Sequence, residues 1–163
     1  MTELEKWMGT AQLTLHPIKT RLVDMNAPRA SFDFLGYRFL RTKGGKLLRL
    51  VRDKSKKKLR VNIKVHTMRT NGKSLPAIIA LINPILRGWF NYFRQAHPSE
   101  LAEMSGWVRM RLRSILRKRA GGRGRGRGLD HRKWSKDYFD RRKLFNLEAA
   151  RLEALSLLKG ANC

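Results

Sequence analysis

The sequence predicts a mainly α-helical protein with a small β part, an α+β fold. Short apolar and aromatic runs separated by glycines fill the first fifty residues, as is typical of β-hairpins. After residue 74, apolar residues recur at spacings of three and four, which is the period of amphipathic helices. We therefore expect a few short antiparallel strands, then a three-helix bundle, then short helices.

Charge is the strongest compositional signal. The 163 residues include 37 Lys and Arg but only 12 Asp and Glu, which gives a net charge of +25. Such an excess attracts polyanions and predicts a nucleic-acid partner. The single cysteine, Cys163, excludes a disulfide framework and a thiolate metal site. Because no signal peptide or membrane span is evident, we expect a soluble, intracellular protein without a membrane partner.

Several short elements are predicted before residue 53. Thr2–Trp7 has the pattern of a short helix, and Thr20–Asp24 that of a strand. Residues 32–40, "FDFLGYRFL", predict a further strand in which Gly36 marks a bulge or a close backbone approach. Gly44-Gly45 predicts a hairpin turn. So few strands resemble the end of a larger sheet rather than a complete one.

The helical region begins ambiguously. Residues 59–65 alternate like a strand and also share a helix face, and the local pattern slightly favours the strand. Ser74 predicts the N-cap of a helix, and Asn83-Pro84 predicts a second start, so we expect two helices that meet at a kink. Ser99 predicts the N-cap of a further helix that extends to Arg119.

The last part of the chain starts with an Arg-Gly alternation at residues 121–129. Such a sequence cannot hold a helix, so it predicts a flexible linker or an arm that follows a polyanion. Residues 130–163 predict two short helices, the second of which is capped by Asn146.

No catalytic chemistry is predicted. The four histidines lie in unrelated settings without metal-ligand spacing. Asp137 and Asp140 are close in sequence, but the Lys and Arg around them favour surface ion pairs. Phosphate-binding glycine loops are missing as well. We therefore predict no catalytic residue, no metal and no cofactor.

Binding residues are predicted instead, first in the segment "NPILRGWFNYFR" at residues 83–94. On a helix its large aromatic residues share a face that we interpret as core, while Arg87, Asn91 and Arg94 lie opposite and are predicted to contact phosphates. Tyr92 either stacks on a base or closes the edge of the bundle. The other predicted phosphate contacts are basic: Lys54, Lys56, Lys57, Lys58, Arg109, Arg113, Arg117, Arg123, Arg125 and Arg127.

Four segments resemble, in order, the closing part of group II intron-encoded reverse transcriptases, also called maturases. They are "LTLHPIKTRLVD", "FDFLGYRF", "RTNGKSLPAIIALINPILRGWFNYFR" and "WVRMRLRSILRKR". The resemblance covers residues 13–119 and continues loosely through "WSKDYFDRRKLFNLEAA". It makes Arg87, Gly88, Trp89, Asn91, Tyr92 and Arg94 the hallmark positions of the family's thumb.

The resemblance divides the chain into four parts. Residues 1–52 would be a remnant of the polymerase palm, and 53–120 the maturase-specific helical thumb, or X domain. Residues 121–129 would link this thumb to a C-terminal helical segment at 130–163. Since the family's thumb is helical, the resemblance predicts a helix rather than a strand at residues 59–65.

The function implied by the resemblance is RNA binding without catalysis. The chain would anchor on structured group II intron RNA in a ribonucleoprotein of the bacterial cytoplasm and assist splicing and intron mobility. The family's YADD catalytic hairpin would lie before the first residue, so we expect no polymerase activity from this chain alone. Two alternatives stay open: a subunit that completes a split reverse transcriptase with an upstream chain, or a general basic protein that binds DNA as well as RNA.

Overall fold

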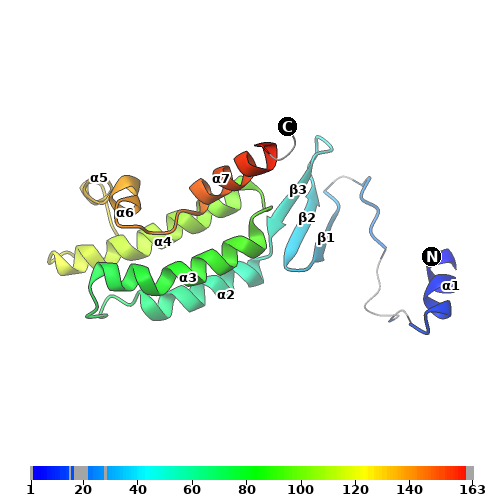
Figure 1. The fold of residues 1–163 in the computed structure, drawn as a ribbon, viewed down its shortest axis with the longest axis horizontal. Coiled ribbons are helices and arrows are strands. Elements are labelled where there is room, and N and C mark those ends of the chain that lie inside the picture. Colours follow the sequence, from blue (N-terminus) through cyan, green and yellow to red (C-terminus); the bar gives the residue numbers. More distant parts are fainter. Residues whose placement is uncertain (1, 15, 17–21, 28, 161–163) are drawn as a thin grey trace.

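The computed structural model describes residues 2–14, 16, 22–27 and 29–160. A small antiparallel sheet leads into three long helices, and shorter helices lie over them (Figure 1). This arrangement confirms the predicted mainly α fold with a small antiparallel sheet. The elements are α1 (Thr2–Thr10), β1 (Ser31–Phe34), β2 (Tyr37–Arg41), β3 (Leu47–Val51), α2 (Asp53–His66), α3 (Leu75–Phe93), α4 (Pro98–Arg119), α5 (Leu129–Lys133), α6 (Lys136–Asp140) and α7 (Leu147–Gly160).

The three strands form a meander in the order β1-β2-β3. The hairpin predicted at Gly44-Gly45 is confirmed, and Gly45 has a φ of +78°. Of the two alternatives predicted at Gly36, the bulge is wrong, because Gly36 and Leu35 form a turn between two separate strands. The close backbone approach is confirmed, since a Cβ at Gly36 would lie 3.3 Å from the Phe93 ring. Gly36 takes a φ of +80°, in the left-handed region that favours glycine.

The N-terminal predictions have mixed outcomes. The predicted short helix exists as α1 and continues to Thr10. Of the strand predicted at Thr20–Asp24, Thr20 and Arg21 lie outside the described residues. Residues 22–24 are described and form no strand.

α2 resolves the ambiguity at residues 59–65 in favour of the helix. Leu59 and Ile63 are buried one turn apart, whereas Val61 and Val65 are exposed. Leu59, Val61, Ile63 and Val65 would share one face of a strand. Because Val61 and Val65 lie toward solvent while the other two are buried, their alternation did not indicate a strand. The helix implied by the resemblance is confirmed.

α3 is one continuous helix with Pro84 inside it, so the second helix start predicted at Asn83-Pro84 is wrong. Its N-cap is Ser74 as predicted, with the hydroxyl accepting from Ala77 N–H at 3.4 Å. Asn83 does not cap a helix, because its side chain bonds a distant loop. The amide donates to Lys143 O at 2.8 Å, and its oxygen accepts from Phe145 N–H at 2.8 Å.

α4 begins two residues earlier than predicted. Pro98 is its first residue, and the N-cap is His97 rather than Ser99. The His97 Nδ1 atom accepts from Ser99 N–H at 3.4 Å. Proline suits the first turn of a helix because it lacks an N–H that would otherwise be unpaired there.

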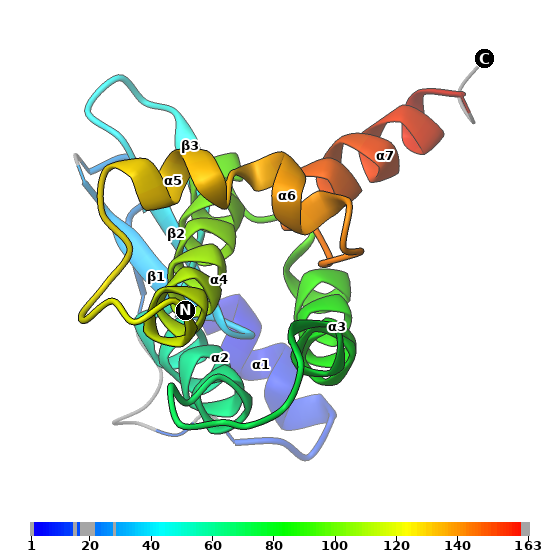
Figure 2. The ribbon, with the colours of Figure 1, turned by 90° about the vertical axis from the view of Figure 1, so that its left-hand side faces the viewer.

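The C-terminal part is held against the bundle. The first predicted helix is divided into α5 and α6, while Asn146 caps α7 as predicted and accepts from Glu148 N–H at 3.1 Å. Phe139 and Leu147 are almost fully buried in the main core. Figure 2, which looks along the bundle, shows α5 and α6 above α4, on the side away from α2.

The hydrophobic core has two parts. The main part lies among α2, α3 and α4 and includes the C-terminal residues Trp134 and Phe139. A smaller part consists of Val51, Phe93 and Ala96 and joins the sheet to the end of α3. Among the described helices, none combines the length and the apolar character needed to cross a membrane.

Candidate nucleic-acid interface

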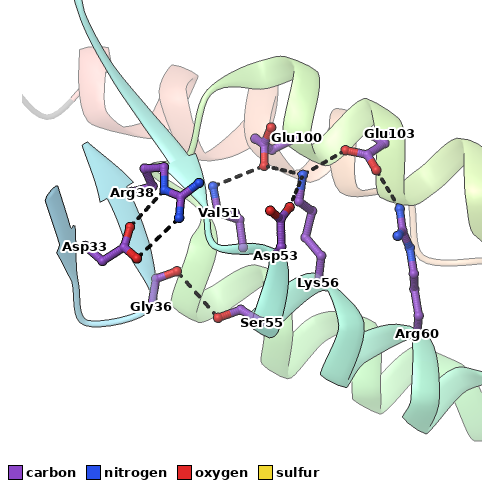
Figure 3. Close-up of polar contacts among 10 residues, drawn as sticks. All are labelled: Asp33, Gly36, Arg38, Val51, Asp53, Ser55, Lys56, Arg60, Glu100 and Glu103. Atoms are coloured by element: carbon purple, nitrogen blue, oxygen red, sulfur yellow. Dashed lines mark hydrogen bonds and ion pairs between the residues drawn. The ribbon is translucent and has the colours of Figure 1, made fainter. Parts of the chain in front are cut away.

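Several acidic side chains form ion pairs between elements, where the sheet meets the helices (Figure 3). Glu100 accepts from Val51 N–H at 3.1 Å and lies 3.1 Å from the Lys56 ammonium. Glu103 lies 3.0 Å from the same ammonium and also pairs with Arg60. These contacts tie β3 and α2 to the first two turns of α4.

Lys56 is consequently a structural residue. Its side chain is only 13% exposed, and its ammonium pairs with Glu100, with Glu103 and, at 3.8 Å, with Asp53. Burial lowers the pKa of Lys56, but hydrogen bonds and charge from Glu103 and Glu100 outweigh this effect, so the pKa is raised overall. We therefore remove Lys56 from the predicted phosphate contacts, because its charge is compensated within the protein.

The arginines predicted as a phosphate-contacting ladder on α4 are also engaged internally. Arg113 is 8% exposed, and its Nε–H donates to Trp134 O at 2.7 Å. Burial lowers the pKa of the Arg113 guanidinium, and the charge of Arg109 lowers it further. Arg109 itself pairs with Glu148 of α7 at 3.4 Å. These two side chains hold the C-terminal segment to α4.

Arg117, the third member of the ladder, organises the Arg-Gly segment. Its guanidinium pairs with Asp130, and its Nε–H donates to Arg123 O at 2.8 Å. Asp130 also accepts from Arg127 N–H at 2.9 Å. This backbone hydrogen bond and the Arg117 charge lower the pKa of the Asp130 carboxyl. The segment between α4 and α5 is therefore fixed at both ends, while the side chains of Arg123, Arg125 and Arg127 remain exposed.

The remaining predicted lysines form an exposed basic surface on α2. Lys54, Lys57 and Lys58 are all exposed and lie on one side of the helix at spacings of three and four. The ion pairs that α2 makes with α4 among the described residues involve Lys56 and Arg60 instead. We call Lys54, Lys57 and Lys58 the α2 basic surface.

In the segment at residues 83–94, the large aromatic residues face the core, as predicted. Phe90 and Phe93 are buried, and Trp89 is partly buried against both parts of the core. Arg87 and Asn91 are exposed, and the Arg87 guanidinium lies 4.7 Å from the centre of the Phe145 ring. Arg87 is thus exposed to solvent, while its guanidinium contacts Phe145 in the loop between α6 and α7.

Tyr92 has features of both predicted roles. Its side chain is 55% exposed, yet its hydroxyl donates to Leu35 O at 2.8 Å. The hydroxyl of Tyr37 in turn donates to Tyr92 O at 2.6 Å. Tyr92 therefore fastens the end of α3 to the β1–β2 turn and still presents its ring at the surface.

A groove of about 490 Å³ lies between α2 and α3 and includes Tyr92. We call it the α2–α3 groove. The sequence analysis did not include Asn62 among the site residues. A helix at this segment places Asn62 one turn after Lys58, and that spacing could have identified it. The lining residues are Gly36, Ser55, Lys58, Leu59, Asn62, Pro84, Ile85, Gly88, Trp89, Tyr92 and Phe93.

Arg94 lies elsewhere, in a larger cleft of about 840 Å³ between β3, the start of α4 and α7. Arg49 and Arg151 line the same cleft, together with Leu155 and Leu157 of α7. The three polar residues predicted to act together on α3 are thus divided: Arg94 lines this cleft, whereas Arg87 lies beside the α6–α7 loop.

Comparison with known proteins identifies a family to which this chain is similar. A family model described as "Group II intron, maturase-specific domain" matches residues 56–142, more than half of the chain. The match includes most of α2, all of α3 and α4, and the segment through α6. No individual curated protein matches the chain. Within the residues that the structure describes, no three His, Cys, Asp or Glu side chains gather as a metal site requires.

Proposed function

Because the chain belongs to the family of the group II intron maturase-specific domain, we propose that it binds folded intron RNA and assists splicing. The chain would act as a ribonucleoprotein component without a polymerase site of its own. Its contribution to splicing would be the binding free energy that favours the correctly folded RNA over misfolded forms.

The observation that supports this proposal is that, among the described residues, many acidic side chains are paired within the protein, whereas a group of basic side chains is not. Acidic residues such as Glu100, Glu103 and Glu148 are engaged in ion pairs between elements. The α2 basic surface, in contrast, lies open to solvent within the segment that matches the family or directly beside it. The lysines of the α2 basic surface are therefore free to meet phosphates, in a chain whose net charge is +25.

RNA phosphates are the natural counter-charges for such a surface. Each phosphate that a lysine or arginine neutralises releases condensed counterions, so affinity falls steeply as salt rises. Arg87 and the three exposed arginines of the Arg-Gly segment would extend the contact beyond α2. Such contacts position the protein on RNA but carry no sequence information by themselves.

The experiment is a salt titration of filter binding to a group II intron RNA. Replacement of Lys54, Lys57 and Lys58 by Gln should lower the slope of log affinity against log salt by roughly three, one per lost phosphate contact. The same charge change at Lys6, Lys43 and Lys46, outside α2 and α3, is the matched control and should alter the slope little.

Two results would contradict the proposal. The first is an affinity of the unmodified protein for intron RNA that does not change with salt. The second is an equal loss of slope in both triple variants, which would mean that total charge rather than the α2 basic surface governs binding. Equal affinity for intron RNA and duplex DNA would favour a general nucleic-acid binder.

A second candidate function rests on the sheet. Phe34, Leu35 and Leu47 are each more than half exposed, although they belong to or adjoin strands. A neighbouring polymerase palm on another chain would cover such residues and use this protein as its thumb. Primer extension that arises only on mixing with a chain carrying the catalytic hairpin would support this role.

A further inference from the structure

We propose that the α2–α3 groove binds one unpaired nucleobase of the RNA, with the adjoining phosphate at Lys58. This inference rests on the proposed function and names the part of the RNA that the site would recognise. The volume of about 490 Å³ falls within the size range of small-ligand sites in proteins. The α3 wall of the groove is aromatic and the α2 wall is polar, and a nucleotide can bind to both kinds of surface.

The α3 wall offers aromatic surface. Trp89 and Tyr92 line it one turn apart, and Tyr92 is 55% exposed. Hydrogen bonds at the Tyr92 hydroxyl and carbonyl hold this residue in place before any ligand arrives. An exposed but fixed aromatic ring can stack on a base without an added cost of ordering the side chain.

The α2 wall offers polar groups. Asn62 is exposed, and its amide can both donate to and accept from the edge of a base. Lys58 precedes it by one turn on the same wall and carries a charge for a phosphate. Base-edge recognition and phosphate binding are therefore side by side along one helix.

Gly88 leaves the α3 backbone bare at this groove. A Cβ atom built on Gly88 would meet no other atom within 4 Å, so the space beside it is open. Glycine costs helix stability of about 0.5–1 kcal/mol relative to alanine, and no packing contact at this position explains it. The open space beside Gly88 would let a ligand approach the helix backbone closely at this groove.

Trp89 supplies a further observation. Its Nε1–H is buried and has no hydrogen-bond acceptor among the described residues. Buried polar groups without a partner are uncommon in native proteins and often indicate a missing ligand or water. Because this N–H is closed to solvent, an oxygen of a bound nucleotide would accept from it only after a shift of the Trp89 ring.

An unpaired base is the occupant that these features favour. Bases inside an RNA duplex are stacked and cannot enter a groove between two helices, whereas bases in loops and bulges can be turned outward. The lysine at the rim and the strongly basic chain also select a polyanion over a peptide.

The test compares two RNA hairpins that differ only in one bulged 2-aminopurine. We expect the full-length protein to bind the bulged hairpin about tenfold more tightly than the paired one and to quench the 2-aminopurine fluorescence by stacking. Gly88→Leu fills the groove with a good helix-forming residue, so the fold should persist while both hairpins bind with the affinity of the paired one.

Two further variants make the test specific. Ala102→Leu places the same side chain at an exposed position of α4 outside the groove and should keep the preference for the bulged hairpin. Asn62→Ala, also at an exposed position, should reduce the preference several-fold without affecting binding of the paired hairpin.

The outcomes separate this inference from the proposed function. Equal binding of the two hairpins by the unmodified protein would overturn the inference while leaving RNA binding intact. A preference that persists in Gly88→Leu would also overturn it, because the base would then bind elsewhere. Failure to bind either hairpin at low salt would contradict the proposed function itself.

Discussion

Replacement of Arg113 by alanine should destabilise the protein without changing its salt-dependent affinity for RNA. The sequence predicts that Arg113 contacts phosphates, as one of three arginines spaced four apart. In the structure its side chain is buried, and its Nε–H donates to Trp134 O at 2.7 Å. The guanidinium also lies 5.6 Å from the centre of the Phe139 ring. Its role is therefore to fasten the α5–α6 segment to α4.

The expected loss of stability follows from these contacts. A hydrogen bond from a charged donor contributes about 1.5–3 kcal/mol, and its removal leaves the Trp134 carbonyl unpaired. The contact with Phe139 adds roughly 0.5–2 kcal/mol. Since removal of a desolvated charge offsets part of this loss, we expect a net destabilisation of about 2–4 kcal/mol. For a chain of this length, that corresponds to a fall in Tm of roughly 5–15 °C.

Urea denaturation followed by circular dichroism measures the free energy of unfolding, and filter binding at several salt concentrations measures the phosphate contacts. Arg125→Ala, which removes an exposed arginine of the Arg-Gly segment, is the matched control and should leave stability almost unchanged. An Arg113→Ala protein with normal stability and a reduced salt slope would refute the structural role and restore the phosphate contact.

Two further predictions concern Gly36 and Asp130. Gly36→Ala should cost about 1–3 kcal/mol in urea denaturation, because alanine is disfavoured at a φ of +80° and its Cβ would lie 3.3 Å from the Phe93 ring; unchanged stability would contradict this packing. The lowered pKa of Asp130 means that its contribution to stability is complete above the ordinary aspartate pKa and is lost as pH falls through the lower folded-state pKa. The Tm difference between the unmodified protein and Asp130→Asn should thus shrink on acidification from pH 6 to about pH 2, and a constant difference would show that the Asp130 charge is irrelevant.

The sequence was sufficient for elements whose signals are local. Gly44-Gly45 predicts its hairpin because the turn needs positive φ angles, and Ser74 and Asn146 predict their helix starts because a side-chain oxygen next to free N–H groups is a short-range contact. At Asn83 the same reasoning failed. This residue bonds Lys143 O and Phe145 N–H, which follow about sixty positions later, and no local pattern reveals that competition.

The same distinction between local and distant contacts explains why sequence alone did not separate the internally paired basic residues from the exposed ones. Lys56 and Lys58 are indistinguishable in a run of lysines, yet Lys56 meets Glu100 and Glu103 of α4, whereas Lys58 lies at the groove. Likewise, the acid that pairs with Arg109 is Glu148, on a helix that the sequence does not place beside α4. Basic residues could be predicted as a class, but their division into structural and exposed members depends on the tertiary fold.

The segment at residues 83–94 shows why its residue types occur together. In a helix, successive residues point about 100° apart, so neighbours in sequence meet different parts of the protein. Phe93 packs beneath Gly36 of the β1–β2 turn, and Tyr92 bonds the same turn through Leu35. The residues that fix the sheet to α3 are thus the ones beside the α2–α3 groove. A ligand in that groove would contact the junction of sheet and bundle, so RNA binding there would also stabilise the orientation of the sheet relative to the helices.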